Sequence, residues 1–403
     1  MAQAVLLSNA AFLRLWISNT ASGLATWALP FVLALTIVAD ELSAAYVGLA
    51  LAARTFGFIL AMPVGGVLAD RSGPRRMISG AGVLAALGIL PIVAGVSTFV
   101  GVGFVIIGAC LTGFGQGACR ASYQAIIPRV VSGDQRQAAN AAMTISIRVS
   151  TLVGPSLATV SVLYVGTSIT FLMIAALWSL AALLPANRPQ TPDTSVHRPL
   201  TLSLFISELG DGFSEVRSHP WIVAGLAALS LVITFGYSVT NVLLPQVSKA
   251  HFGGPELLAV SVTTYTLGAL AGALVIARWK PKNIGWIALS GLALYGLVPL
   301  SLIQPSHMIL PIAAFFIAGV GIELFNVPWF TAMQREVPAE RLARVSSVDF
   351  LFSYGLAPLG LAGLTPLTQA IGIIPVLLIC AVICFGAPFI AMIVPSSRGF
   401  SRV

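Results

Sequence analysis

The sequence predicts an all-α membrane protein with twelve transmembrane helices in two six-helix halves related by pseudo-two-fold symmetry. Of its 403 residues, 57% are hydrophobic and 8% are charged, whereas soluble domains are about 45–50% apolar and about 25% charged. Apolar runs long enough to cross a bilayer, roughly 20 residues each, alternate with short polar breaks along the whole chain. The two halves also repeat one local pattern. These observations exclude a water-soluble enzyme and leave no room for a large soluble domain.

Six apolar segments precede the middle of the chain. Some uncharged runs are too long for a single crossing, and each of these suits two helices joined by a turn of small residues. We expect the six spans at 14–40, at 44–69, as a pair within 77–119 that turns at Gly95, Ser97 and Thr98, and as a pair within 149–187 that turns near Gly166.

A linker separates the halves. Residues 186–200 read ANRPQTPDTSVHRPL, a segment of prolines and charges without apolar periodicity. From Thr201 to His219 apolar residues recur at three- and four-residue spacing opposite acidic ones, which predicts a surface helix lying along the membrane. The predicted organisation is a six-helix bundle at 1–185, a cytoplasmic linker with an amphipathic helix at 186–219, and a second bundle at 220–403.

The second half repeats the organisation of the first. Its spans are expected near 221–246 and 257–277, as a pair within 284–334 that turns at Gln304, Pro305 and Ser306, and as a pair within 345–395 that turns near Gly372. In each half a short charged loop precedes a helix with a small residue and a proline, at Gly154-Pro155 and at Ala357-Pro358. A parallel repeat of this kind is typical of transporters with a site at the membrane midplane.

Basic residues predict the orientation. They fall almost entirely in one set of alternating loops, and the opposite loops hold only Lys249. Since Lys and Arg resist translocation, both termini and the linker are expected in the cytoplasm of a multi-pass plasma-membrane protein. The first apolar segment has no basic n-region before it and is expected to remain as an uncleaved span.

The most specific motif stands between the second and third spans, where residues 66–76 read GVLADRSGPRR. Gly66 permits close helix packing, Asp70 caps or pairs at a helix end, and Gly73 turns the loop. This run resembles the cytoplasmic loop signature of the major facilitator superfamily, and the spans, linker and repeat extend the resemblance over nearly the whole chain. The motif residues are Gly66, Asp70, Arg71, Gly73, Arg75 and Arg76.

The resemblance implies roles for these residues. Asp70 is implied to contact the start of the eleventh helix and to latch the halves in the outward-facing state. The alternative is that Asp70 merely balances Arg71 and Arg75 at the surface. Gly154-Pro155 resembles the core of the family's antiporter motif, although Ala158 and Thr159 stand where further glycines are usual.

Four ionisable residues lie inside predicted spans, where a charge is costly and therefore a functional candidate. Arg54 and Asp349 form a possible pair between the halves that breaks during transport. Alternatively, Glu323 or Asp349 carries a proton, Glu323 pairs statically with Arg120, or Asp349 simply favours its helix dipole. Arg54 is expected near the middle of its span, and Arg148 is expected at a similar depth in its own span, unless it extends its side chain toward the cytosol.

Polar and aromatic residues inside the spans are candidates for a substrate cavity or, equally, for helix packing. They are Asn19, Trp27, Tyr237, Asn241, Tyr265 and Asn326. The first helix offers no carboxylate, which argues against a dedicated cation site there. The cavity would be mostly apolar and suited to amphipathic compounds.

The predicted function is secondary active transport by alternating access, as proton-coupled efflux of drugs or metabolites. No phosphate-binding Gly-Lys-Ser/Thr loop is present, and the histidines fall in loops or at span ends, which disfavours an ATP-driven pump, a hydrolase or a metal enzyme. Nutrient uptake, facilitated diffusion and a lipid-flipping or non-transporting scaffold remain alternatives. Expected partners are a small-molecule substrate, protons and the bilayer, without nucleic acid, cofactor or metal, for a chain acting as a monomer.

Overall fold

The computed structural model describes residues 9–39, 41–97, 101–186, 202–252, 256–279 and 281–401. These residues are almost entirely helical, and no strand occurs among them. The prolines and charges of the predicted linker at 187–200, together with Thr98 of one expected turn, lie outside the described residues.

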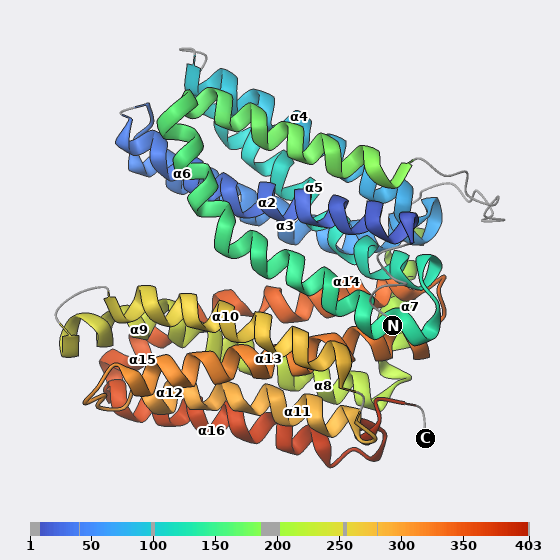
Figure 1. Ribbon diagram of the computed structural model, residues 1–403, viewed down its shortest axis with the longest axis vertical. Coiled ribbons are helices and arrows are strands. Elements are labelled where there is room, and N and C mark those ends of the chain that lie inside the picture. The colour runs from blue at the N-terminus through green and yellow to red at the C-terminus, as the bar shows by residue number, and fades with distance from the viewer. Residues whose placement is uncertain are drawn as a thin grey trace. The chain divides into compact units, whose positions relative to one another are not determined.

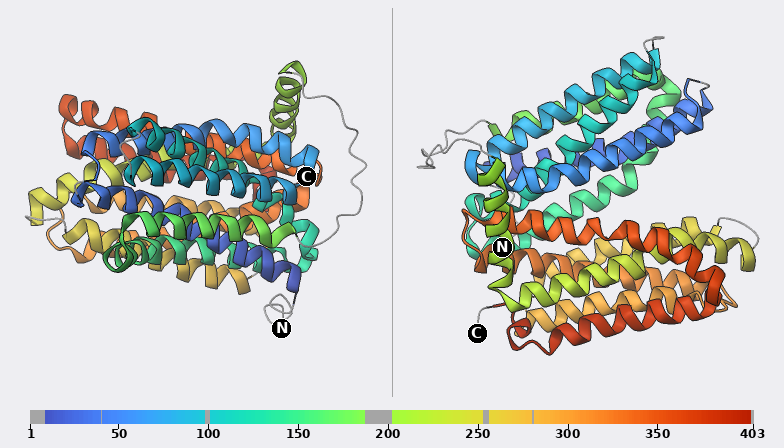
Figure 2. Two further views of the ribbon diagram at one scale, coloured as in Figure 1. Left: turned by 90° about the horizontal axis from the view of Figure 1, so that it is seen from above. Right: turned by 180° about the vertical axis from the view of Figure 1, so that it is seen from behind.

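The first part of the chain forms long helices. They are α2 (Ala10–Val38), α3 (Ala44–Ser72), α4 (Pro74–Ser97), α5 (Val102–Val130) and α6 (Arg136–Leu183). The backbone of α6 is broken at Gly166, whose φ of 82° and ψ of 170° are non-helical, so α6 is two helices that meet at the predicted turn. The predicted amphipathic helix is α7 (Leu202–Arg217), drawn in yellow-green in Figure 2.

The second part repeats this arrangement in shorter pieces. They are α8 (Pro220–Leu231), a π-helical segment (Val232–Tyr237), α9 (Ser238–Phe252), α10 (Glu256–Arg278), α11 (Ile284–Ala293), α12 (Leu297–Ser301), α13 (Ile309–Glu336), α14 (Leu342–Gly355), α15 (Ala357–Ile371) and α16 (Ile373–Met392).

The described residues contain 10 helical stretches long and apolar enough to cross a membrane. One of them folds back at Gly166, and α14 followed by α15 supplies a further broken span, so the helices occupy the positions of the twelve predicted spans. Turns at Gln304 and Gly372 are also confirmed by their positive φ values.

The turn expected at Gly95, Ser97 and Thr98 begins later than Gly95, because α4 continues to Ser97. A Cβ atom at Gly95 would collide with the side chain of Val105 on α5. This glycine therefore serves close packing of two helices, and Gly101, with φ of 99°, takes the left-handed conformation that begins α5.

The helices form two compact units. In the first unit α5 packs against α3 and α4, and in the second α13 packs against α10 and α11 (Figure 1). Gly88 of α4 and Gly108 of α5 face each other so closely that a Cβ on either would strike the carbonyl oxygen of the other, and Gly291 and Gly321 do the same between α11 and α13. Both units thus use a reciprocal glycine pair to bring two backbones together.

The compact units do not coincide with the two halves of the sequence. The first unit includes Val337–Val348, which begins α14, and the second includes Asn140–Ile145 near the start of α6. Each half therefore contributes the start of one helix to the packing of the other unit. The division of the chain at the linker stays a prediction. Each of these two segments belongs to the compact unit formed mainly by the other half.

Large apolar side chains cover the outer surface of the helices. Leu163, Val382 and Ile393 are each more than two-thirds exposed, and many others are about half exposed. So much exposed apolar surface is unfavourable in water but is the normal surface of a protein in lipid.

Candidate functional site

The motif loop, residues 66–76, positions a buried carboxylate at the end of α3. Gly73, with φ of 86°, ends α3, and Pro74 begins α4. Asp70 therefore lies in the last turn of α3, where its side chain is only 3% exposed. The interpretation of Asp70 as a solvated surface charge does not describe this position.

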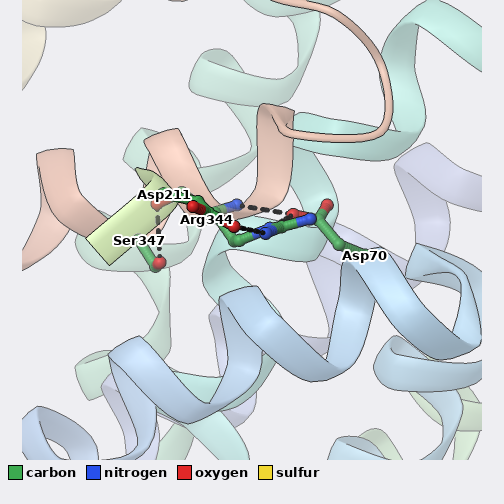
Figure 3. A network of polar contacts seen from close by, with 4 residues as sticks. All are labelled: Asp70, Asp211, Arg344 and Ser347. Carbon is green, nitrogen blue, oxygen red and sulfur yellow. Dashed lines mark hydrogen bonds and ion pairs between the residues drawn. The ribbon is translucent and has the colours of Figure 1, made fainter. Parts of the chain in front are cut away.

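Arg344 in the first turn of α14 is the partner of Asp70. Its Nε donates to Oδ2 of Asp70 across 2.7 Å, and its backbone N–H donates to the same oxygen across 3.3 Å (Figure 3). The carboxylate thus binds both a guanidinium and an amide at the start of a helix, where the helix dipole also favours a negative charge.

Gly66 allows this ion pair to form. A Cβ at Gly66 would collide with the side chain of Ser347 and approach the carbonyl of Ala343, so α3 and α14 touch there through backbone. Ser347 in turn donates its hydroxyl to the carbonyl oxygen of Arg344 across 2.8 Å. The motif glycine and the motif carboxylate therefore act on the same turn of α14.

Arg344 also connects the motif loop to the amphipathic helix. Its Nη1 lies 3.4 Å from Oδ2 of Asp211 on α7, and Gly212 packs against the Cβ of Arg344 (Figure 3). Sequence reasoning missed Arg344, because a single basic residue near a helix start carries no motif, and it saw in Asp211 only the polar face of α7. Of the other motif residues, Arg71 and Arg75 are half-buried and Arg76 is exposed.

In the second unit, an uncharged pair of amides makes a contact comparable to that of Asp70 with Arg344. Asn140, near the start of α6, donates its amide to Oγ1 of Thr331 and to Oε1 of Gln334 on α13, both across 2.9 Å. Gln334 donates back to Oδ1 of Asn140 across 3.1 Å. Beside this amide pair, Ala141 packs with Ile276, Ala277 and Val327 in an apolar cluster.

The ionisable residues predicted inside the spans have different surroundings. Arg54 on α3 donates through Nη2 to the carbonyl of Thr26, across 3.0 Å, and to Oε1 of Gln116, across 2.7 Å. Glu323 is fully buried on α13, and Arg148 is half-buried on α6. Arg54 and Asp349 belong to different units, and their pairing stays a prediction.

Asp349 lies in an aromatic cluster. It is 2% exposed and accepts a hydrogen bond from Nε1 of Trp329 across 2.9 Å. The Trp329 ring stacks on Phe325 and meets Trp221 and Phe400 edge-on, with ring centroids 5.1, 5.3 and 5.5 Å away. Phe400, near the end of the chain, is itself fully buried there.

The predicted cavity residues are divided between the two units. In the first unit Asn19 donates to Ser146 across 2.7 Å, and a Cβ at Gly154 would lie 3.3 Å from the Cβ of Trp27, which brings Trp27 to the antiporter-like Gly154-Pro155. In the second unit Tyr265 packs against Tyr295. The remaining predicted residues are Tyr237 and Asn241, which are exposed, and Asn326, which is half-buried.

Sequence reasoning missed Tyr295, which packs against Tyr265 in the second unit. Its ring is 6.0 Å from that of Tyr265, and its hydroxyl lies 3.3 Å from Oγ1 of Thr240. Among the described residues, no group of three or more His, Cys, Asp or Glu side chains is placed to hold a metal ion.

Long apolar helices, and within the first unit a motif loop whose carboxylate binds the start of a later helix, define a polytopic membrane transporter. The chain belongs to the major facilitator superfamily, whose family model, described as Major Facilitator Superfamily, matches residues 15–360.

Two relatives from Bacillus subtilis (strain 168) are similar in sequence. The uncharacterized MFS-type transporter YfiS is 24% identical over 384 residues, which are 90% of this chain and 88% of YfiS. The uncharacterized MFS-type transporter YvqJ is 24% identical over 242 residues, 59% of this chain, and the match spans 57% of the length of YvqJ.

Solved structures share the fold at low sequence identity. A bacterial homologue of the iron transporter ferroportin, in an outward-facing state, has a TM-score of 0.74 and 15% identity over 98% of this chain and 100% of that one. The human organic anion transporter MFSD10 (TETRAN) has a TM-score of 0.74 and 13% identity over 96% of this chain and 99% of its own. At such identities the likeness establishes the fold alone.

Proposed function

We propose that the chain is a secondary active transporter that works by alternating access and exports small amphipathic compounds in exchange for protons. It acts as a monomer in a bacterial plasma membrane, with both termini and the linker in the cytoplasm. The buried ion pair of Asp70 with Arg344 carries this proposal, because it joins the motif loop to the start of α14 through a contact that is specific and breakable.

The energetics of this pair suit a latch. Removing one partner from a buried ion pair typically costs about 3–5 kcal/mol, because the other charge remains buried. Here Arg344 also contacts Asp211, whose side chain is 60% exposed. When Asp70 separates from Arg344, Asp211 remains as a partner for the guanidinium, which lowers the cost of opening.

Coupling to protons is assigned to the carboxylates inside the helices. Asp and Glu in membrane transporters bind and release protons along their relays. Asp349 and Glu323 are both buried in the second unit, on α14 and α13. One of them is proposed to release its proton on one side of the membrane only.

The orientation and the direction of transport rest on the distribution of basic residues and on Gly154-Pro155. Basic residues resist translocation, and one set of alternating loops holds nearly all of them. Gly154 packs against Trp27 at a proline-containing stretch of α6, which supports a bend in this helix of the kind that the antiporter-like motif implies.

Dye flux in inverted vesicles under an imposed pH gradient tests the proposal. The panel contains anionic, neutral and cationic amphipathic dyes, and wild type is compared with Glu323→Gln and Asp349→Asn. Gradient-dependent accumulation that is lost in either variant supports proton antiport and identifies the carrier. Flux of a dye or nutrient without any dependence on the gradient would replace export by uptake or facilitated diffusion, and movement of lipid alone would indicate a flippase.

A further inference from the structure

A small cavity lies inside the first unit, between α2, α5 and the second arm of α6. Its lining residues are Ser22, Gly23, Thr26, Gln116, Cys119, Arg120, Tyr123 and Trp178. Its volume is about 10 Å³, which is room for one water molecule. Arg54 borders it, since the Arg54 guanidinium is hydrogen-bonded to the lining residues Thr26 and Gln116.

Two positive charges meet at this cavity. Arg120 is part of the wall, and Arg54 binds the wall residues Thr26 and Gln116, so both arginines lie at the same cavity. Both side chains are half-buried. Among the described residues neither arginine has an ion pair with a carboxylate, and Arg54 is held by neutral oxygens alone. Like charges away from water are unfavourable unless a negative charge joins them.

The cavity also presents hydrogen-bond donors that lack acceptors. The indole Nε1 of Trp178 is buried in the wall and has no acceptor among the described residues, and the same holds for Nε of Arg54. The acceptors nearby are already engaged, because the carbonyl of Thr26 and Oε1 of Gln116 both bind Arg54. The free hydrogen-bonding capacity is therefore for an acceptor, and the net charge is positive.

We propose that Arg54 and Arg120 form a binding site for an anionic group, completed by the indole N–H of Trp178. Guanidinium groups bind carboxylates and related oxyanions through paired, charge-assisted hydrogen bonds. The cavity has room for one water-sized group, so it takes an oxygen of the anionic group, and the rest of an amphipathic compound lies outside it. If the bound molecule is the substrate, this inference rests on the proposed transport function and restricts the substrates to anionic compounds. Binding of an anion at this site does not itself depend on transport.

The close approach of α3 and α5 near Gln116 is consistent with this site. Gly113 stands where the resemblance to the family leads one to expect an arginine, and a Cβ there would collide with the backbone carbonyl of Arg54. α3 and α5 thus approach closely, and the guanidinium of Arg54 reaches Gln116 from the neighbouring helix. The positive charge is supplied by α3 and by Arg120, later on α5.

Binding to the purified full chain tests the proposal without any need for flux. Sodium benzoate is titrated in zwitterionic detergent buffer and followed by tryptophan fluorescence and by thermal unfolding, with benzyl alcohol and benzylamine as neutral and cationic probes of the same ring. The expected result is a saturable response to benzoate alone. Arg54→Gln and Arg120→Gln should each weaken it about tenfold or more, which corresponds to the loss of a charge-assisted contact. Arg14→Gln, at an exposed position on α2, is the matched control.

The source of the anionic group is distinguished by competition. If chloride and sulfate displace benzoate, the site also accepts free inorganic anions. If they do not, the site selects organic anions, and both results support an anion site. An equal response to benzyl alcohol or benzylamine would overturn it, as would benzoate binding that survives in both arginine variants. If a glutamine variant does not fold, two other results test the anion site. Wild type should bind benzoate but not benzyl alcohol or benzylamine, and Arg54→Lys should bind benzoate more weakly than wild type.

Failure of this inference is separable from failure of the proposed function. Benzoate binding in a protein that moves no dye would leave the anion site in place and remove export. Proton-coupled flux of neutral or cationic dyes without anion binding would do the reverse.

Discussion

Trp329 donates its indole N–H to Oδ1 of Asp349 across 2.9 Å, and both side chains are buried within the second unit. The indole is held by rings on three sides, those of Phe325, Trp221 and Phe400. Because Phe400 packs edge-on against Trp329, this late segment of the chain helps to orient the donor to the Asp349 carboxylate.

We expect Trp329→Phe to destabilise the protein by about 1–3 kcal/mol, the usual cost of leaving a buried polar group without its partner. The effect should shrink in an Asp349→Asn background, because the two substitutions remove the same contact. Thermal unfolding of both single variants and the double variant measures this coupling. Trp221→Phe is the matched control, since the indole nitrogen of Trp221 has no hydrogen-bond partner among the described residues. Additive effects of Trp329→Phe and Asp349→Asn would contradict the assigned contact.

The two carboxylates bound to Arg344 should differ sharply in their contribution to stability. Asp70 is 3% exposed and 2.7 Å from Nε, whereas Asp211 is 60% exposed and 3.4 Å from Nη1. We expect Asp70→Asn to cost about 3 kcal/mol, the low end for a broken buried pair because Asp211 remains. Asp211→Asn should cost less than about 1 kcal/mol, as exposed pairs do. Unfolding in denaturant compares them, and equal losses would show that burial does not govern this network.

Gly66→Ala should separate α3 from the start of α14. The new methyl group would meet the Ser347 side chain and approach the carbonyl of Ala343, so we expect a loss of about 1–3 kcal/mol, as for other overpacked contacts. Gly80→Ala is the control, because nothing lies within 4 Å of a Cβ at Gly80 on α4. Alanine favours a helix over glycine, so this control should be neutral or stabilising. A neutral Gly66→Ala would mean that the two helices do not touch there.

The amide pair of Asn140 and Gln334 should behave as one unit. Both side chains are buried and bind each other in both directions. Asn140→Ala or Gln334→Ala leaves the other amide without its partner and should cost about 1–3 kcal/mol. The double variant should cost little more than one single variant, which a thermal-unfolding cycle will measure. A double variant as destabilised as the sum of the two would show that the amides contribute separately.

The amino-acid sequence alone determined the membrane fold, because the positions of the helices depend on local apolar runs and turn residues. The breaks at Gly166 and Gly372 were predictable, since glycine takes positive φ without steric cost. Gly95, expected in the next turn, lies inside α4 for a non-local reason, its contact with Val105 on the next helix. A glycine that serves packing and a glycine that serves a turn look alike in the sequence.

Only the tertiary structure decided which side chains meet. The resemblance of the motif loop directed attention to Asp70 and to the start of a later helix, but the guanidinium of Arg344, 274 positions away, has no sequence signal of its own. The same is true of Trp329 beside Asp349 and of Gln116 beside Arg54. Hydrophobic periodicity reports which face of a helix is buried. A buried charge is unfavourable without a partner, and the packing of distant helices decides which group lies close enough to be that partner.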